Sequence, residues 1–120
     1  MSRYVLLLKA TESGASRMLL SGGSGANKQR EAIEQLGGTK IEQLVVTGSY
    51  DVVITCDLPD PLTSLAVGLA LEAGGFYADV LSAFTPDEVD QARAKLPQLP
   101  APEVDGALGE RGPQAPGSTE

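Results

Sequence analysis

Hydrophobic and polar residues alternate along the chain with two different periods, and these periods predict its secondary structure. A nearly continuous apolar run from Tyr4 to Lys9 is typical of a strand covered on both faces. Alternation over residues 39–57 predicts two more strands, and the run from Phe76 to Phe84 predicts a fourth. Apolar positions three and four apart predict helices over residues 26–36 and 61–73. The expected order is therefore strand, helix, strand, strand, helix, strand.

Signals for the starts of helices refine this picture. Asp60 precedes Pro61, the usual arrangement of an N-cap followed by proline in the first helical position. Thr85 and Glu88 have the spacing of a capping box and predict a short C-terminal helix. Residues 12–24 are polar and rich in glycine, and we expect a loop there.

A tight turn should join the two middle strands. Gly48 and Ser49 lie between two β-rich runs, and a two-residue loop that begins with glycine suits a type II′ turn. That turn would set the cross-strand pairs Lys40 with Asp57, Val45 with Val52, Val46 with Asp51, and Thr47 with Tyr50. The register matters because a slip of one residue would exchange the two faces of the sheet.

The order of elements is that of the ferredoxin-like βαββαβ unit, an α+β fold in which two helices cover one face of a four-stranded antiparallel sheet. The other face stays open, and in the predicted register it carries Leu44, Val46 and Val53. Such an apolar patch is unusual on a monomer. Pairing two sheets face to face would bury it, so we expect a homodimer or higher oligomer with these three residues in the interface. The alternative is that the C-terminal tail or the segment 12–24 covers the patch.

The composition restricts the classes of function. A net charge of −7 over 120 residues, with no basic stripe, argues against a nucleic-acid partner. The absence of histidine excludes histidine-ligated haem or metal and acid–base catalysis by histidine. There is no Walker loop or dinucleotide fingerprint, so we expect no cofactor. We also expect no metal, since Asp57, Asp60 and Glu72 do not converge in the predicted fold.

The periodic pattern ends near residue 96. Residues 1–96 predict a single domain, whereas residues 97–120 form an acidic tail rich in proline and glycine, for which we expect disorder. The apolar run at the N-terminus is too short for a signal peptide or a membrane span. Cys56 is the single cysteine and permits no internal disulfide, which fits a reducing compartment. We therefore expect a cytoplasmic protein with no membrane contact.

Several short stretches together resemble the GYD domain family, which takes its name from a glycine, tyrosine and aspartate motif. Here the motif is spaced, because Ser49 stands between Gly48 and the Tyr50-Asp51 pair. The other landmarks are Glu34 to Gly38, Leu69 to Gly75 and Leu81 to Thr85. The resemblance covers roughly residues 3–96 and implies a small dimeric α+β barrel of the ferredoxin-like kind. The family is functionally uncharacterised, so the resemblance implies no catalytic residues.

Tyr50 and Asp51 are the candidate ligand-binding residues. In the predicted sheet Asp51 lies on the open face beside the turn, near the rim of a dimer cavity, and Tyr50 points to the helical side. The functional interpretation is a polar pair that lines a small-molecule pocket, with Asp51 as acceptor or proton carrier. The structural interpretation, which we favour, is that Asp51 bonds turn amides and Tyr50 closes the end of the core.

Two further features have structural and functional interpretations. The glycines from Gly22 to Gly25 precede a helix with Lys28 and Arg30, and their free N–H groups could cradle an anion. We favour a flexible loop there. Cys56 should be a small buried apolar residue rather than a nucleophile.

Two hypotheses for the function remain open. The first is a non-catalytic oligomeric module that binds a small ligand between its sheet and a partner subunit. The second is a cofactor-independent enzyme of the oxygenase or isomerase kind, which fold analogy alone supports. We favour the first because no catalytic constellation is recognisable in the sequence.

Overall fold

The computed structural model describes residues 1–97, which belong to two compact units, Met1–Phe84 and a second unit that begins at Thr85. All of the predicted tail except its first residue lies outside the described residues. The first unit contains β1 (Ser2–Ala10), α1 (Glu12–Ser21), the 3₁₀ turn η1 (Gly22–Gly25), α2 (Ala26–Gln35), β2 (Thr39–Val45), β3 (Val52–Leu58), α3 (Pro61–Ala73) and β4 (Phe76–Ala83). The second unit contains α4 (Pro86–Arg93).

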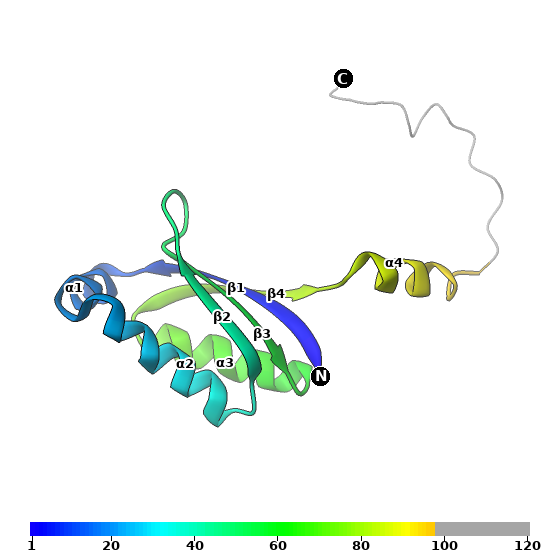
Figure 1. Cartoon of the computed structure of the whole chain (residues 1–120), viewed down its shortest axis with the longest axis horizontal. Coiled ribbons are helices and arrows are strands. Elements are labelled where there is room, and N and C mark those ends of the chain that lie inside the picture. The colour runs from blue at the N-terminus through cyan, green and yellow to red at the C-terminus, as the bar shows by residue number, and fades with distance from the viewer. Residues whose placement is uncertain (98–120) are drawn as a thin grey trace, which may run out of the picture. The chain divides into compact units, whose positions relative to one another are not determined.

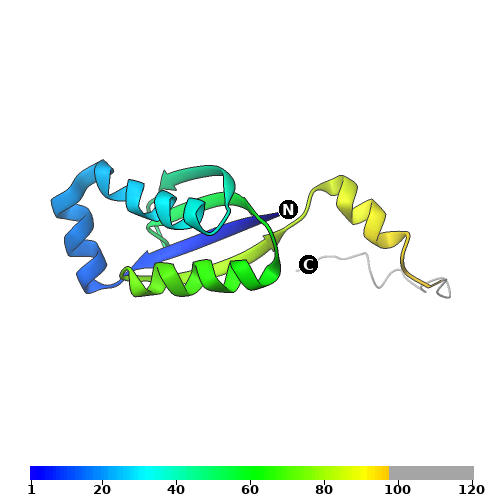
Figure 2. The same cartoon turned by 90° about the horizontal axis from the view of Figure 1, so that it is seen from below.

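The four strands form one open sheet in the order β2-β3-β1-β4, and every neighbouring pair is antiparallel. Helices α2 and α3 run along one face of this sheet (Figure 1). At one end of the helical layer α1 crosses to the start of α2 (Figure 2). The predicted α+β class and four-stranded antiparallel sheet are confirmed.

The hydrophobic core lies between the sheet and the helices α2 and α3. Alternate residues of the two central strands β1 and β3 point into it and are buried. From the helical side α2 contributes Ile33, and α3 contributes Val67 and Leu71. The strand residues of the core are Tyr4, Leu6, Leu8, Val52, Ile54, Cys56, Leu58 and Phe76.

The segment 12–24 is not the predicted loop. The Oγ1 atom of Thr11 accepts a hydrogen bond from the Gly14 amide at 3.2 Å, which caps α1, and Glu12 lies in its first turn. Gly14 is buried, and a Cβ built on it would lie 2.2 Å from the carbonyl oxygen of Gly75. The glycine that suggested a loop in the sequence is therefore required where the helix meets the backbone of the α3–β4 corner.

The connection between β2 and β3 also differs from the prediction. Val45 pairs with Val52, as expected, but the strands end there and residues 46–51 form a longer loop in place of a two-residue turn. Within it the Val46 amide donates to the Asp51 carbonyl at 2.9 Å. At the other end of the hairpin the register shifts, so that Thr39 and not Lys40 stands opposite Asp57. Lys40 has a positive φ of 52°, which accommodates this irregularity.

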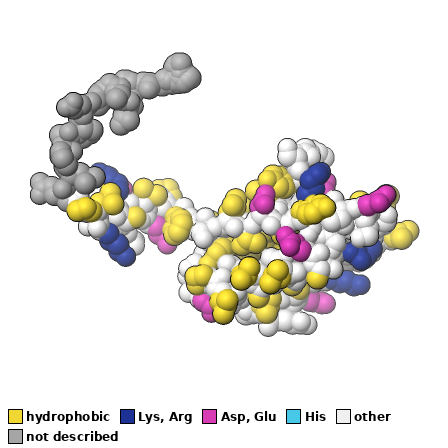
Figure 3. Space-filling view, turned by 180° about the vertical axis from the view of Figure 1, so that it is seen from behind, with side chains coloured by type: hydrophobic (Ala, Val, Ile, Leu, Met, Phe, Trp, Pro, Cys, Tyr) yellow, Lys and Arg dark blue, Asp and Glu magenta, His cyan; other side chains and the backbone are white. Residues whose placement is uncertain are grey.

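The predicted N-caps at Asp60 and Thr85 are confirmed. Asp60 accepts a hydrogen bond from the Thr63 amide at 2.7 Å, and Pro61 follows as the first residue of α3. Thr85 and Glu88 form the complete capping box of α4. On the outer side of α3, hydrophobic side chains gather at the surface (Figure 3), and Leu62, Leu65 and Leu69 are exposed there.

Candidate functional site

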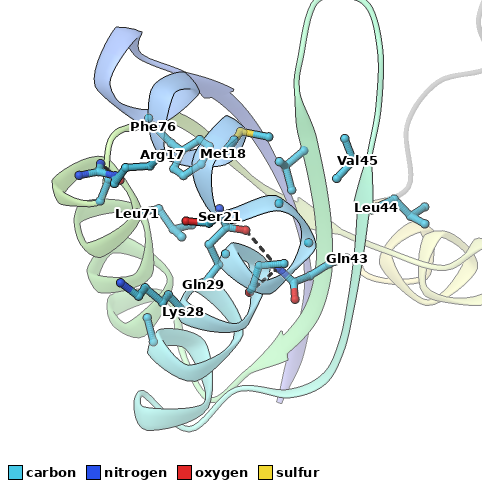
Figure 4. A pocket seen from close by; sticks show the side chains of 18 of the residues that line it. Arg17, Met18, Ser21, Lys28, Gln29, Gln43, Leu44, Val45, Leu71 and Phe76 are labelled. Atoms are coloured by element: carbon cyan, nitrogen blue, oxygen red, sulfur yellow. Dashed lines mark hydrogen bonds between the residues drawn. The ribbon is translucent and has the colours of Figure 1, made fainter.

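A cavity of about 480 Å³ lies on the helical side of the sheet in the first unit. Its walls come from α1, η1 and α2, from the C-terminal part of α3, and from strands β2, β3 and β4 (Figure 4). This volume lies in the range typical of small-molecule sites. The side chains that give the cavity its character are Arg17, Met18, Lys28, Gln29, Gln43, Val45, Val52, Leu71 and Phe76.

The hollow exists because the elements above it carry small side chains. Helix α2 presents Ala26 and Ala32 to this space, and η1 consists of glycines apart from one serine. Val45 therefore remains 75% exposed, although it pairs with Val52 on the helix-covered side of the sheet and Val52 is only 4% exposed. A side chain that should be part of the core thus forms the edge of an unfilled space.

Two amides define the polar part of the floor. The Gln43 Nε2 atom donates to the Ala26 carbonyl and to the Gln29 Oε1 atom, each at 3.1 Å. These bonds join β2 to the start of α2 across the cavity. Because both donor hydrogens of Gln43 are used, its orientation is fixed.

Two cationic side chains, Arg17 and Lys28, line the cavity on the side away from Val45 and Leu44 (Figure 4). The Nη2 atom of Arg17 donates to the Gly74 carbonyl at the end of α3, where a cation is favoured by the helix dipole. No aspartate or glutamate of the described residues lines this space. Within residues 1–97 no ion pair involves Arg17 or Lys28.

Tyr50 and Asp51 lie outside this cavity. The Asp51 carboxylate accepts a hydrogen bond from the Ala10 amide at 2.8 Å, so it bonds the neighbouring strand and not the turn. The Tyr50 hydroxyl donates to the Asp79 carboxylate at 2.8 Å. This bond raises the pKa of Tyr50 above its usual value of 10.0, and the charge of Asp79 raises it further.

The side of the sheet predicted for Tyr50 is wrong. Asp79 is opposite Leu7 and belongs to the open face, so the phenol reaches that face and not the helical one. The reason is the long loop of residues 46–51, which frees Tyr50 from the strict alternation of a two-residue hairpin.

The residues predicted for an oligomer interface lie on or beside the open face. Leu44 pairs with Val53 on this face and also borders the cavity, since β2 is the edge strand, and Val46 follows at the start of the loop. Leu44 is 59% exposed, whereas Val46 and Val53 are partly buried. Leu7 and Leu81 extend the apolar surface over β1 and β4.

Polar pairs bound this apolar surface at both ends. The Arg3 Nη1 atom lies 3.1 Å from the Asp57 Oδ1 atom, and Arg3 also donates to the Thr55 hydroxyl at 3.0 Å. The bond between Tyr50 and Asp79 lies towards the opposite end. An apolar centre with polar ends is the usual composition of a protein–protein interface.

The other features considered in the sequence, a reactive cysteine, a metal site and a membrane span, are not supported by the described residues. Cys56 is fully buried in the core, and this burial raises the pKa of its thiol. In residues 1–97 no three histidine, cysteine, aspartate or glutamate side chains are placed to hold a metal ion. None of the helices in this part of the chain combines the length and the apolar character needed to cross a bilayer.

Sequence reasoning missed the cavity. It considered the glycines from Gly22 to Gly25, with Lys28 on the following helix, as a cradle for an anion, but it favoured a flexible loop for the glycines. The sequence does contain one indication of a cavity, which is a lack of large side chains. Alanines stand at positions 26 and 32, where a helix over a sheet usually presents larger apolar residues.

Comparison with known proteins gives one match. A model of the GYD domain covers residues 4–92. No curated protein and no solved structure matches the chain.

Proposed function

The chain belongs to the GYD domain family, and we propose that it is a non-catalytic small-ligand-binding module that acts as a homodimer in the cytoplasm. The proposal rests on the cavity of about 480 Å³ enclosed by α1, α2, α3 and the sheet. Much of its lining is apolar, with a few fixed polar groups, which is the usual composition of a ligand site. The ligand lies inside one subunit, on the helical side of the sheet.

The absence of catalysis is inferred from the chemistry of the cavity walls. Of the described residues that line it, only Arg17 and Lys28 have charged side chains, and both are cations. Asp51 lies outside the cavity, and its carboxylate already accepts the Ala10 amide. A cofactor-independent oxygenase or isomerase would need an acid or base beside its substrate. We therefore give preference to binding over catalysis.

The second part of the proposal is that two subunits pair through the open faces of their sheets. The strand order, with β1 and β3 in the centre and helices on one face, supports a ferredoxin-like unit of the dimeric α+β barrel type. In that arrangement the open faces of two sheets meet. Leu44, Val46 and Val53 then become buried with Leu7 and Leu81, which removes their apolar surface from water.

A cavity-filling variant tests ligand binding. Ala32 lines the cavity from α2, so Ala32→Phe should occupy the space and weaken the binding of the neutral apolar probe N-phenyl-1-naphthylamine by about tenfold or more. Ala15→Phe is the matched control, because Ala15 is exposed on α1 and does not line the cavity. Fluorescence titration measures both. Equal probe binding by the two variants and the unmodified protein would refute the cavity as the ligand site.

Charge insertion tests the dimer. Val53→Lys should give monomers in sedimentation velocity, because face-to-face sheets would bury the ammonium without a partner. Leu81→Lys, at a residue that is 46% exposed in the subunit, tests the same face with less risk to folding. Leu65→Lys on the outside of α3 is the control and should leave the dimer intact. Dissociation by Leu65→Lys and not by Leu81→Lys would place the interface on α3 and contradict the proposal.

A further inference from the structure

We propose that the ligand of this cavity is a small amphipathic monoanion, with a carboxylate or similar head at Arg17 and Lys28 and an apolar tail towards Val45 and Val52. This inference rests on the proposed function, since it names the chemical class that the cavity binds. Both cations lie on the side of the cavity away from Val45 and Leu44, and the ligand should carry its charge on that side (Figure 4).

The anionic head is inferred from the charge balance of the walls. The chain as a whole has a net charge of −7, with 16 acidic and 9 basic residues. The described lining residues contain two bases and no acid, the opposite of this overall excess. Two cations that line one space, with no carboxylate among the described lining residues, lower the free energy of an anion there.

Both cations have donors available for a head group. Arg17 uses one donor on the Gly74 carbonyl, and a guanidinium has five. Lys28 is exposed on α2 and forms no ion pair within residues 1–97. Each of these groups can donate a charge-assisted hydrogen bond to a carboxylate.

The apolar tail is inferred from the floor. Met18, Val52, Leu71 and Phe76 line it, and Val45 extends the floor to the edge of the sheet while 75% exposed. A tail that covers Val45 removes this surface from water and supplies the packing that α2 does not provide. A polyanion such as a nucleotide would leave this apolar surface unused, so the observations favour a single charge on an aliphatic body.

Three probes of equal length separate the head group from the tail. Octanoate, 1-octanol and octylamine share one chain and differ in charge, and each is titrated against bound N-phenyl-1-naphthylamine at low ionic strength. We expect octanoate to bind about tenfold more tightly than octanol and octylamine to bind most weakly, because hydrogen bonds to charged groups are the stronger ones. Octanoate binding should also weaken as salt is added.

Variants at Lys28 test the role of the cations. Lys28→Met should weaken octanoate binding about threefold to tenfold and leave octanol binding unchanged. Lys28→Glu should reverse the preference between octanoate and octylamine. The control is Lys95→Met, which changes the net charge equally at an exposed residue of the second unit. Because Lys28 is exposed, these changes remove no core contact.

The outcomes distinguish this inference from the proposed function. If all three probes displace N-phenyl-1-naphthylamine equally well, the cavity binds ligands but the anionic head is refuted. If none of them displaces it and Ala32→Phe has no effect, the proposed function fails as well. If Lys95→Met weakens octanoate binding as much as Lys28→Met does, the effect comes from net charge and the assigned site is wrong.

Discussion

Replacing Gly14 by alanine is expected to destabilise the protein, although alanine is the better helix former. Helix propensity alone would favour the substitution by about 1 kcal/mol. The contact with the α3–β4 corner opposes it, since the new Cβ would lie 2.2 Å from the Gly75 carbonyl oxygen. This neighbour is backbone and cannot rotate away as a side chain could. The sign of the effect is therefore set by the tertiary contact.

The cost can be worked out from the bonds at this corner. Overpacking of this kind costs about 1–3 kcal/mol. The Gly75 carbonyl also accepts hydrogen bonds from the Thr11 amide and the Thr11 hydroxyl, both at 2.9 Å, and each contributes about 0.5–1.5 kcal/mol. If the backbones separate, these bonds weaken together. After the gain in propensity is subtracted, we expect Gly14→Ala to lower the free energy of unfolding by about 1–5 kcal/mol.

Urea denaturation measures this difference, and Gly23→Ala is the matched control. Gly23 follows α1 in the same segment, and a Cβ built on it would meet no atom within 4 Å. This control should be neutral or slightly stabilising. Gly14→Ala should also reduce the binding of N-phenyl-1-naphthylamine, because α1 forms one wall of the cavity. A Gly14→Ala protein that is as stable as the Gly23→Ala control would refute the packing of α1 against Gly75.

Three other predictions concern separate parts of the chain. Ile33→Ala should lower the free energy of unfolding by about 2–5 kcal/mol in urea and increase amide exchange in α2, because this is the one buried side chain among the ten residues of that helix. Asp79→Asn should lower the raised pKa of Tyr50 in an ultraviolet titration, with Tyr50→Phe identifying its signal. The stability that the bond between Tyr50 and Asp79 contributes is present below pH 10.0 and is lost as the pH rises through the folded-state pKa of Tyr50. If Tyr50 titrates at the same pH in Asp79→Asn as in the unmodified protein, the bond is contradicted. Thr85→Ala should reduce the helical chemical shifts of α4, since it removes the bond to the Glu88 amide, and unaltered shifts would show the cap to be dispensable.

Much of the fold could be predicted because its signals are local. The N-cap at Asp60 and the capping box at Thr85 each depend on residues three positions apart, and both are present as expected. The pairing of Val45 with Val52 was predicted from the turn at Gly48 and Ser49 and is present, although a longer loop replaces that turn. In contrast, α1 depends on contacts with Thr11 and Gly75. Gly75 lies more than sixty residues after Thr11 in the sequence. The glycines and serines of residues 12–24 do not by themselves indicate that contact, so the sequence pattern predicted a loop.

The site was harder to predict, since a cavity is defined by the side chains that are missing. No residue type marks it, and its walls combine α1, α2, α3 and three strands. The carboxylate of Asp51 was noticed for its chemistry, yet its position is determined by the Ala10 amide, 41 residues away in sequence. Its partner could be identified only after β1 and β3 were placed side by side.

The register shift in β2 affects how this sheet can aggregate. Because β2 is an edge strand, its outer amide and carbonyl groups would otherwise offer a template to a strand from another molecule. The positive φ of Lys40 interrupts the regular spacing of these groups and leaves a charged side chain beside the break. A second chain cannot add to this edge as a continuous ladder. Growth into an extended β-fibre is therefore opposed at this edge of the molecule.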